Sequence, residues 1–289
     1  MGTTHANFSC SETKASTGRI KSKVKVERKQ SDSQIDEMAG ALLIAEDECK
    51  AIPPLTSRYG DMQVEDAYRI QMRNVEAKKK RGRTVVGKKA GLTSEAIQKM
   101  FDVDEPDYGH LFDDMIVASG VSIDCSRLIQ PKAEPEIGFL LAKELRGPGI
   151  TADDVFRATS LIAPTLEIID SRIENWKIRL ADTISDNASS GMVVLGAYLP
   201  ISPELDLKEV EARLEKNGKL VSSGPGRAVL GDPAHAVAWL ANKLSTLGES
   251  LKPGELILPG SFCAAVDARP GDVIAATFTG LGTVTVRFT

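Results

Sequence analysis

The amino-acid sequence predicts an α+β fold, and three observations support this class. Apolar residues recur at helical spacing in the first part of the chain, and short β-rich runs separated by Gly-containing turns fill the last part. No long alternation of strands and helices lies between them, which disfavours a doubly wound parallel sheet. A chain of 289 residues, 42% of them hydrophobic, can bury one large core or two modest ones.

Residues 1–33 are predicted to form a disordered tail. They are rich in Ser, Thr, Lys and Gly and contain few large apolar residues, so burial cannot offset the entropy lost on ordering them. A nucleic-acid arm or a targeting peptide is the alternative, because the tail carries a basic cluster of Arg19, Lys21, Lys23, Lys25, Arg28 and Lys29.

Two amphipathic helices are expected next. Apolar residues recur with helical spacing over 35–50, and a second helix over 64–82 is closed by Gly82. The residue pattern then changes from helical spacing. It predicts a short strand that enters a turn over residues 83–93 and a short helix over residues 94–101.

The second half of the chain combines helices with β-rich runs. Thr151 and Asp154 form the capping box of one predicted helix, and another has Asp232 as its cap, Pro233 in its first turn and Gly248 as its stop. The β-rich runs that follow are expected to pair as antiparallel sheet, and they cover 255–260, 272–280 and 283–288.

Composition and charge exclude several classes of function. The 36 basic and 40 acidic residues give a net charge of −4, which offers no general attraction to nucleic acid or to an anionic membrane surface. No apolar run reaches the roughly 18 to 20 residues that span a bilayer, and no secretory signal precedes the helices, so we expect a soluble cytoplasmic protein. The four cysteines are scattered without CxxC spacing, which indicates reduced, structural thiols.

Two glutamates occupy the start of an apolar run in IQPKAEPEIGFLLAKEL, residues 129–145. If 133–142 is a strand, Glu134 and Glu136 project from the same side, and apolar residues follow on both faces. Two like charges at the edge of a buried layer repel each other and are costly to desolvate unless a cation lies between them. Glu167, embedded in the apolar run SLIAPTLEIID, is a third candidate.

Three carboxylates without histidine or cysteine favour Mg²⁺ or Mn²⁺ over zinc. The alternative is an exposed strand edge or a salt-bridged pair, and no spacing rule links Glu167 to the other two glutamates.

Other polar residues allow more than one interpretation. Lys88 and Lys89 precede a turn in which Gly91 lets a ligand approach the backbone, although both could be ordinary surface lysines. In the acidic stretch 104–115, solvated loop acids are the default, with Asp107 or Asp114 as functional candidates. The segment DNASSG (186–191) reads as a helix cap or a ligand-binding turn, and His235, inside a helix, reads as structural.

Several motifs occur together in an order that resembles a known family. These are VVGKKAGLTS, EPDYGHLFDDM, LIQPKAEPEI, LEIIDSRIENWKI, DTISDNASSG and GLGTVTVRF. The set resembles the 2-keto-4-pentenoate hydratase family of the fumarylacetoacetate hydrolase superfamily over about residues 50–289. The resemblance implies a mixed β-roll, fumarylacetoacetase C-terminal-like, with flanking helices. It divides the chain into an N-terminal helical and active-site-loop portion at 34–118 and a β-roll catalytic core at 119–289.

The resemblance also implies a site and a reaction. The family's metal-binding glutamates match Glu134, Glu136 and Glu167, and its proton-transfer residues match Lys89 and Asp107. The metal is Mg²⁺ or Mn²⁺, and the substrate is a small 2-oxo or 2-hydroxydienoic acid. The expected reaction adds water to 2-hydroxypenta-2,4-dienoate and gives 4-hydroxy-2-oxopentanoate, a late step in aromatic meta-cleavage.

Two alternatives stay open within this resemblance. A 4-oxalocrotonate decarboxylase would share the metal site, and a non-catalytic partner would use the fold as a scaffold for such an enzyme. The family also implies a homo-oligomer, and a neighbouring pathway enzyme is the protein partner that it suggests. No nucleic-acid or membrane partner is expected.

Overall fold

The computed structural model describes residues 1–2, 30–94, 97–99, 102–103, 105–202 and 204–289. Most of the predicted tail, residues 3–29, lies outside the described residues. The helix predicted over 94–101 lies partly outside them as well, and residues 97–99 are helical. Helix α1 (Asp32–Asp47) begins within the last residues assigned to the tail, because Ser31 forms a capping box with Gln34.

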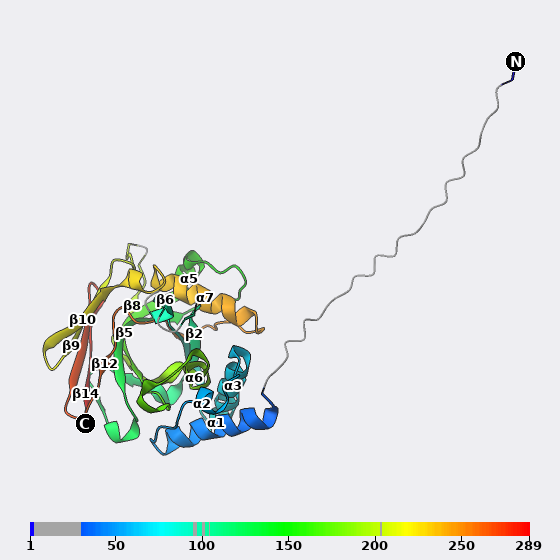
Figure 1. Ribbon diagram of the computed structural model, residues 1–289. Helices are drawn as coiled ribbons and strands as arrows, with labels where there is room; N and C mark the ends of the chain where they lie inside the picture. Colours follow the sequence, from blue (N-terminus) through cyan, green and yellow to red (C-terminus); the bar gives the residue numbers. More distant parts are fainter. Residues whose placement is uncertain (3–29, 95–96, 100–101, 104, 203) are drawn as a thin grey trace.

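Four helices pack together beside the sheets (Figure 1). They are α1, α2 (Leu55–Arg58), α3 (Val64–Lys80) and α6 (Leu180–Ser185). Their apolar faces share one core, which includes Ile35, Leu42, Leu55, Ile70 and Ile184. The two long helices predicted from periodicity are confirmed, and α6 joins them from a distant part of the chain.

The larger sheet has nine strands and curls into a roll (Figure 1). Its main order is β2 (Asp107–Phe112), β1 (Val85–Gly91), β11 (Leu256–Leu258), β5 (Lys132–Leu141), β6 (Thr159–Ile169), β7 (Ser190–Leu195) and β3 (Ile116–Ala118). Two short strands pair at its side, β12 (Val266–Asp267) with β5 and β8 (Leu199–Pro200) with β6. Contacts of β2 with β7 and with the 3-10 turn η4 (Asn187–Ser189) bring the two ends of the sheet together.

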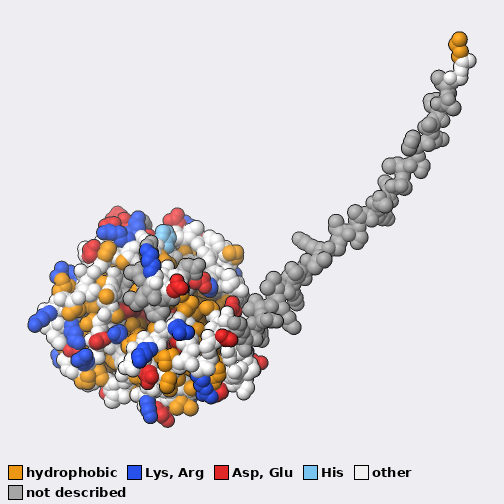
Figure 2. Space-filling view, in the orientation of Figure 1, with side chains coloured by type: hydrophobic (Ala, Val, Ile, Leu, Met, Phe, Trp, Pro, Cys, Tyr) orange, Lys and Arg blue, Asp and Glu red, His pale blue; other side chains and the backbone are white. Residues whose placement is uncertain are grey.

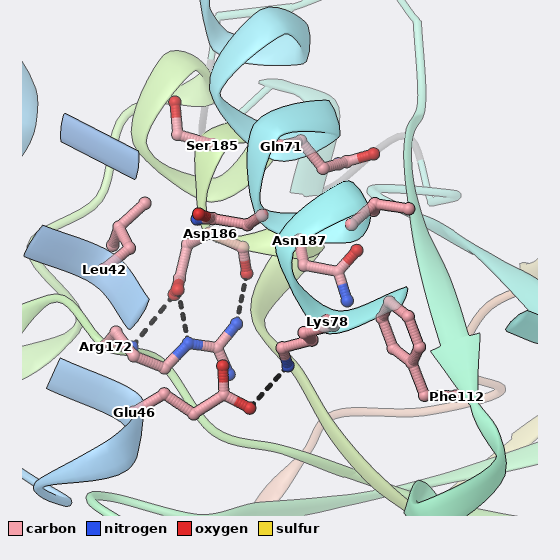
Figure 3. Close-up of a pocket in the computed structure, with 11 residues that line it drawn as sticks. Leu42, Glu46, Gln71, Lys78, Phe112, Arg172, Ser185, Asp186 and Asn187 are labelled. Carbon is pink, nitrogen blue, oxygen red and sulfur yellow. Dashed lines mark hydrogen bonds and ion pairs between the residues drawn. The ribbon is translucent and has the colours of Figure 1, made fainter. Parts of the chain in front are cut away.

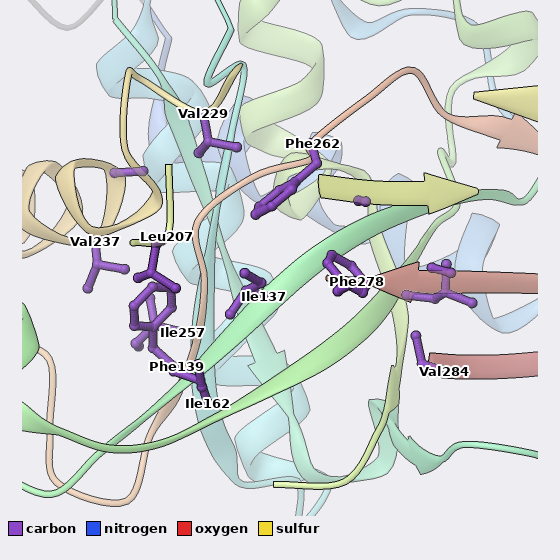
Figure 4. Packing of buried hydrophobic residues seen from close by; sticks show 14 of the residues in the cluster. Ile137, Phe139, Ile162, Leu207, Val229, Val237, Ile257, Phe262, Phe278 and Val284 are labelled. Carbon is purple, nitrogen blue, oxygen red and sulfur yellow. The ribbon is translucent and has the colours of Figure 1, made fainter. Parts of the chain in front are cut away.

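The smaller sheet has five strands in the order β10 (Lys219–Pro225), β9 (Glu211–Lys216), β13 (Val273–Phe278), β14 (Gly282–Phe288) and β4 (Ser122–Ile123). It packs against the outer face of the roll through the largest apolar cluster (Figure 4). Phe139 and Ile162 contribute to this cluster from β5 and β6, and Phe278 and Val284 contribute from the smaller sheet. The odd-numbered residues of β5 therefore face this core, which leaves the even-numbered residues facing the interior of the roll.

Helices α5 (Ala152–Ala158) and α7 (Pro233–Ser245) pack against each other and against the same core. The predicted caps are confirmed: Thr151 forms the capping box of α5 with Asp154, and Asp232 accepts a hydrogen bond from Ala234 N at 2.8 Å. The other short 3-10 helices are η1 (Asp113–Met115), η2 (Cys125–Arg127), η3 (Glu174–Trp176) and η5 (Gly226–Ala228).

One strand assignment needs a correction. The runs at 272–280 and 283–288 pair antiparallel as predicted, whereas β11, from the run 255–260, lies in the larger sheet. It is parallel to β1 and antiparallel to β5, and its three residues are all buried. A strand that is buried on both faces cannot be told from a half-exposed one by a run of three apolar residues.

Lys, Arg, Asp and Glu side chains are interspersed over the face shown in Figure 2. This distribution agrees with the near balance of charge in the sequence and shows no continuous basic surface on that face. Within the part of the chain that the structure describes, no helix has the length and apolarity needed to cross a bilayer.

Candidate metal centre and active site

The three glutamates predicted as ligands come from two neighbouring strands. Glu134 and Glu136 lie on β5, Glu167 lies on β6, and the two strands are antiparallel. Glu134 is directly opposite Glu167, and Glu136 is opposite Thr165, so all four side chains project from one face of the sheet. This face lines the interior of the roll.

The structure brings the three carboxylates together. One oxygen from each of Glu134, Glu136 and Glu167 lies within 4.8 Å of the others. Glu136 is 1% exposed and Glu167 is 0% exposed, while Glu134 is partly buried. The burial argument made from the apolar context of Glu167 is therefore correct, although no spacing in the sequence connected it to the pair.

The cluster has few hydrogen-bond donors to compensate its buried carboxylates. Among the described residues, neither oxygen of Glu167 has a hydrogen-bond partner, and Glu136 Oε2 accepts only the Gly260 N–H at 2.8 Å. Burial and the neighbouring carboxylates raise the pKa of Glu134 to about 7 and raise that of Glu136 well above its ordinary value. A hard divalent cation fits this set of donors, because it binds oxygen ligands and offsets their mutual repulsion.

Lys89 is the cation nearest to this cluster among the described residues. It lies on β1, is 4% exposed, and places Nζ 3.4 Å from Glu167 Oε1. Burial lowers its pKa, but the carboxylates of Glu167 and Asp107 raise it, and the net shift is upward. Lys89 is therefore held as an ammonium group inside the roll.

Lys88 has a different role because side chains alternate along a strand. It is also buried, and its Nζ lies 2.8 Å from Glu255 Oε1. His110, which pairs with Lys88 in the register of β1 and β2, is on the same outer side. Burial and Lys88 lower the pKa of His110 to about 3, so this imidazole is neutral. The surface-lysine alternative is wrong for both lysines.

Asp107 lies at the start of β2, opposite Gly91 and two register positions from the pair of Lys89 with Gly109. Its Oδ2 accepts a hydrogen bond from Thr183 Oγ1 at 3.2 Å. A Cβ on Gly91 would be 2.3 Å from Asp107 Oδ1, so the glycine is what makes room for this carboxylate. Burial raises the pKa of Asp107 above its ordinary value, although Lys89 acts in the opposite direction.

The remaining candidates from the sequence lie elsewhere. Asp114 pairs with Arg83 at the surface, at 3.0 Å, and His235 is exposed on α7. The DNASSG segment does include a helix cap, because Asp186 is the C-cap of α6. The next three residues form a left-handed turn, and Asn187 in that turn binds the backbone of His110.

Sequence reasoning missed two residues at the site. Thr183 donates a hydrogen bond to Asp107, and the N–H of Gly260 donates one to Glu136. Neither residue is charged, and neither belongs to a spaced motif that would identify it as part of a site. The requirement for glycine at position 260 is visible only in the structure, where the φ of +116° favours glycine.

Comparisons with known proteins agree with this geometry. The family model of the fumarylacetoacetate (FAA) hydrolase C-terminal domain matches residues 70–289. A 2-hydroxyhexa-2,4-dienoate hydratase from Comamonas testosteroni is 44% identical over 262 residues, which cover 90% of this chain and 99% of that relative. A 2-keto-4-pentenoate hydratase from Paraburkholderia xenovorans is 46% identical over 256 residues, which cover 88% of this chain and 95% of that relative.

A solved structure is similar over almost the same length. The 4-oxalocrotonate decarboxylase from Pseudomonas putida G7, complexed with magnesium and adipate, has a TM-score of 0.88 and 39% sequence identity, and the match covers 91% of this chain and 100% of that one. The resemblance seen in the sequence motifs is therefore confirmed. The chain belongs to the fumarylacetoacetate hydrolase family and, within it, to the 2-keto-4-pentenoate hydratases.

Proposed function

We propose that this chain is a hydro-lyase that adds water to 2-hydroxypenta-2,4-dienoate and gives 4-hydroxy-2-oxopentanoate. The observation that carries the proposal is the meeting of three carboxylates, two of them buried, with a buried ammonium and a buried aspartate inside one roll. Such a concentration of buried charges is costly to the fold, and perturbed groups of this kind cluster at functional sites. The hydratases among its relatives give the substrate class.

Glu134, Glu136 and Glu167 would hold a divalent cation, Mg²⁺ or Mn²⁺. Support comes from the all-oxygen donor set and from the magnesium in the decarboxylase relative. Bound there, the ion supplies positive charge that stabilises negative charge developing on the C2 oxygen of a 2-oxo acid. The choice between the two metals belongs to this proposal as well.

Lys89 and Asp107 are the proposed proton-transfer residues. Hydration of the dienol requires the enol hydroxyl to lose a proton and C5 to gain one. Water then adds at C4 and loses a proton, while C3 gains one. Lys89 is a donor held charged beside Glu167, and Asp107 has an oxygen without a hydrogen-bond partner among the described residues. The pair therefore offers both a proton donor and a proton acceptor on the inner face of β1 and β2.

The second candidate is decarboxylation of 4-oxalocrotonate, favoured by the similarity to the decarboxylase structure over the whole of that chain. The same carboxylate cluster would serve it, because loss of CO₂ also leaves negative charge on the C2 oxygen. A scaffold without catalysis is the third possibility. It gives no reason to keep Glu167 buried beside two other carboxylates with neither of its oxygens hydrogen-bonded among the described residues.

Ultraviolet absorbance of the dienol, followed with and without EDTA, tests these functions. Metal-dependent loss of absorbance without CO₂ release supports the hydratase. Loss of 4-oxalocrotonate with CO₂ release supports the decarboxylase instead. If the absorbance of neither substrate changes in the presence of Mg²⁺ or Mn²⁺, the non-catalytic scaffold is supported instead.

The assembly and location expected from the sequence are part of the proposal. We propose a cytoplasmic homo-oligomer that contacts a neighbouring enzyme of the same pathway. Light scattering of the purified chain measures the oligomer directly, and a monomer at assay concentration would contradict this part of the proposal.

A further inference from the structure

The two carboxylate oxygens of Asp107 have different surroundings. Oδ2 accepts the hydroxyl of Thr183 at 3.2 Å, whereas Oδ1 has no hydrogen-bond partner among the described residues. Oδ1 lies against the backbone of Gly91, and the position of a Cβ there would also be 3.5 Å from Lys89 Nζ. Thr183 therefore occupies one oxygen of Asp107, and the other oxygen lies without a hydrogen-bond partner on the side of Gly91 that Lys89 Nζ also approaches.

Thr183 is presented by a short helix that other residues hold in place. Helix α6 has six residues, too few to be stable alone, and its described side chains from Ala181 to Ser185 are all buried. Near its start, the Asp182 carboxylate accepts hydrogen bonds from Thr56 N at 2.9 Å and Thr56 Oγ1 at 2.7 Å. Just after its end, Asp186 forms a buried ion pair with Arg172 (Figure 3).

The strand that carries Asp107 is joined to the same segment. Asn187 Oδ1 accepts a hydrogen bond from His110 N at 2.8 Å, and Asn187 Nδ2 donates to His110 O at 2.9 Å. Gly109 permits this approach, because a Cβ there would be 2.3 Å from Asn187 O. The helix that carries Thr183 and the strand that carries Asp107 are thus fixed relative to each other independently of the Thr183 hydroxyl.

We propose that Thr183 is a positioning residue for proton transfer: it holds Oδ2 of Asp107 so that Oδ1 is the oxygen that exchanges protons with the substrate. The inference rests on the proposed function, in which Asp107 transfers protons. Thr183 acts through Asp107 and contributes neither to the carboxylate cluster nor to the cation site.

The test compares four variants of the full-length chain with Mg²⁺ and the dienol. Thr183→Val removes the hydroxyl at nearly constant volume, and Thr183→Ala removes it with less bulk in case the valine variant misfolds. Thr183→Ser keeps the hydroxyl. Ser185→Ala is the matched control, because it removes a buried hydroxyl from the same helix that donates only to Ala181 O.

We expect kcat to fall by about tenfold to a hundredfold in Thr183→Val and Thr183→Ala, with KM and the affinity for Mg²⁺ unchanged. Thr183→Ser and Ser185→Ala should keep the wild-type kcat. Wild-type kcat in both variants that lack the hydroxyl would overturn the inference. An equal loss in Thr183→Ser or in Ser185→Ala would overturn it too, because the effect would then come from packing of α6.

Asp107→Asn separates this inference from the proposed function. Loss of turnover in Asp107→Asn together with wild-type kcat in the Thr183 variants rejects only the role of Thr183. Wild-type kcat in Asp107→Asn rejects the proton-transfer role of Asp107 itself, and with it the basis of the inference.

Discussion

Two groups of buried charges in this molecule differ in how their hydrogen-bonding groups are satisfied. Arg172 forms an ion pair with Asp186 and donates a further hydrogen bond to its carbonyl oxygen (Figure 3). It also donates to the carbonyl oxygens of Asp170 and Ser190. Both oxygens of Asp186 accept hydrogen bonds. In the glutamate cluster, by contrast, three carboxylates face one another and Glu167 has no hydrogen-bond partner among the described residues.

This difference distinguishes charges that hold the fold together from charges that form a binding site. A buried ion pair whose donors and acceptors are all matched needs nothing from outside the chain, and its role is to fix the fold. A cluster of like charges without matched donors gains stability only when something positive binds. The following predictions test this distinction, from the largest expected effect to the smallest.

Glu167→Gln should remove activity while leaving the fold intact. We expect kcat to fall by about a thousandfold or more, because a ligand of the proposed cation is lost. The melting temperature of the metal-free variant should change little, since the repulsion among the glutamates is relieved while Lys89 loses its ion-pair partner. Glu136→Ala should behave alike. Turnover at the wild-type rate in either variant would contradict the ligand assignment.

Arg172→Met should show the opposite pattern, with a large loss of stability. It leaves Asp186 buried without its cation, and breaking such a pair costs about 3–5 kcal/mol of unfolding free energy. Urea unfolding of the metal-free protein measures the change. The double variant Arg172→Met with Asp186→Leu should recover part of the loss, and a single variant as stable as the wild type would remove the scaffold role.

Mg²⁺ should stabilise the folded chain only through the glutamates. At a concentration about 100 times its dissociation constant, a ligand of the folded state adds about 2.7 kcal/mol. The unfolding free energy of the wild type should rise accordingly, and that of Glu167→Gln should not. Na⁺ at equal ionic strength is the control. An equal rise in the variant would place the cation elsewhere.

The metal-free protein should lose stability as the pH rises through the raised pKa of the cluster. Glu134 titrates near 7 in the folded chain against 4.5 as its ordinary value, so the folded state binds more protons than the unfolded state between these values. The cost of ionising it is absent below about pH 4.5 and fully present above about pH 7. Urea midpoints in EDTA should fall across this window, and a matched series of Glu134→Gln should fall less.

The three glutamates could be identified as candidate ligands from the sequence because strand alternation and apolar context are local properties. Glu134 and Glu136 share a face at any pairing of β5, and an apolar run on both sides of Glu167 indicates burial wherever that strand pairs. The capping residues Thr151 and Asp232 were visible for the same reason. Convergence of the three carboxylates required the register of β5 and β6, which no local pattern specifies.

Lys88 and Lys89 show the limit of this reasoning. Alternation predicts that the two side chains point to opposite faces, but not which of them points into the roll. That choice depends on the pairing of β1 with β11, from the far end of the chain. Thr183 could not be found either, because its role comes from a contact between α6 and β2. The family resemblance supplied Lys89 and Asp107, which residue patterns alone left undecided.

The insertion of β11 between β1 and β5 has a consequence for how the enzyme matures in a cell. Gly87 of β1 pairs with Leu256 of β11, so β1 reaches this partner only after the roughly 170 residues between them have been synthesised. A nascent chain still attached to the ribosome would expose the edges of β1 and β5 until those residues emerge. We therefore expect the roll to assemble only after β11 has emerged from the ribosome, and chains shortened before residue 256 to aggregate instead of folding.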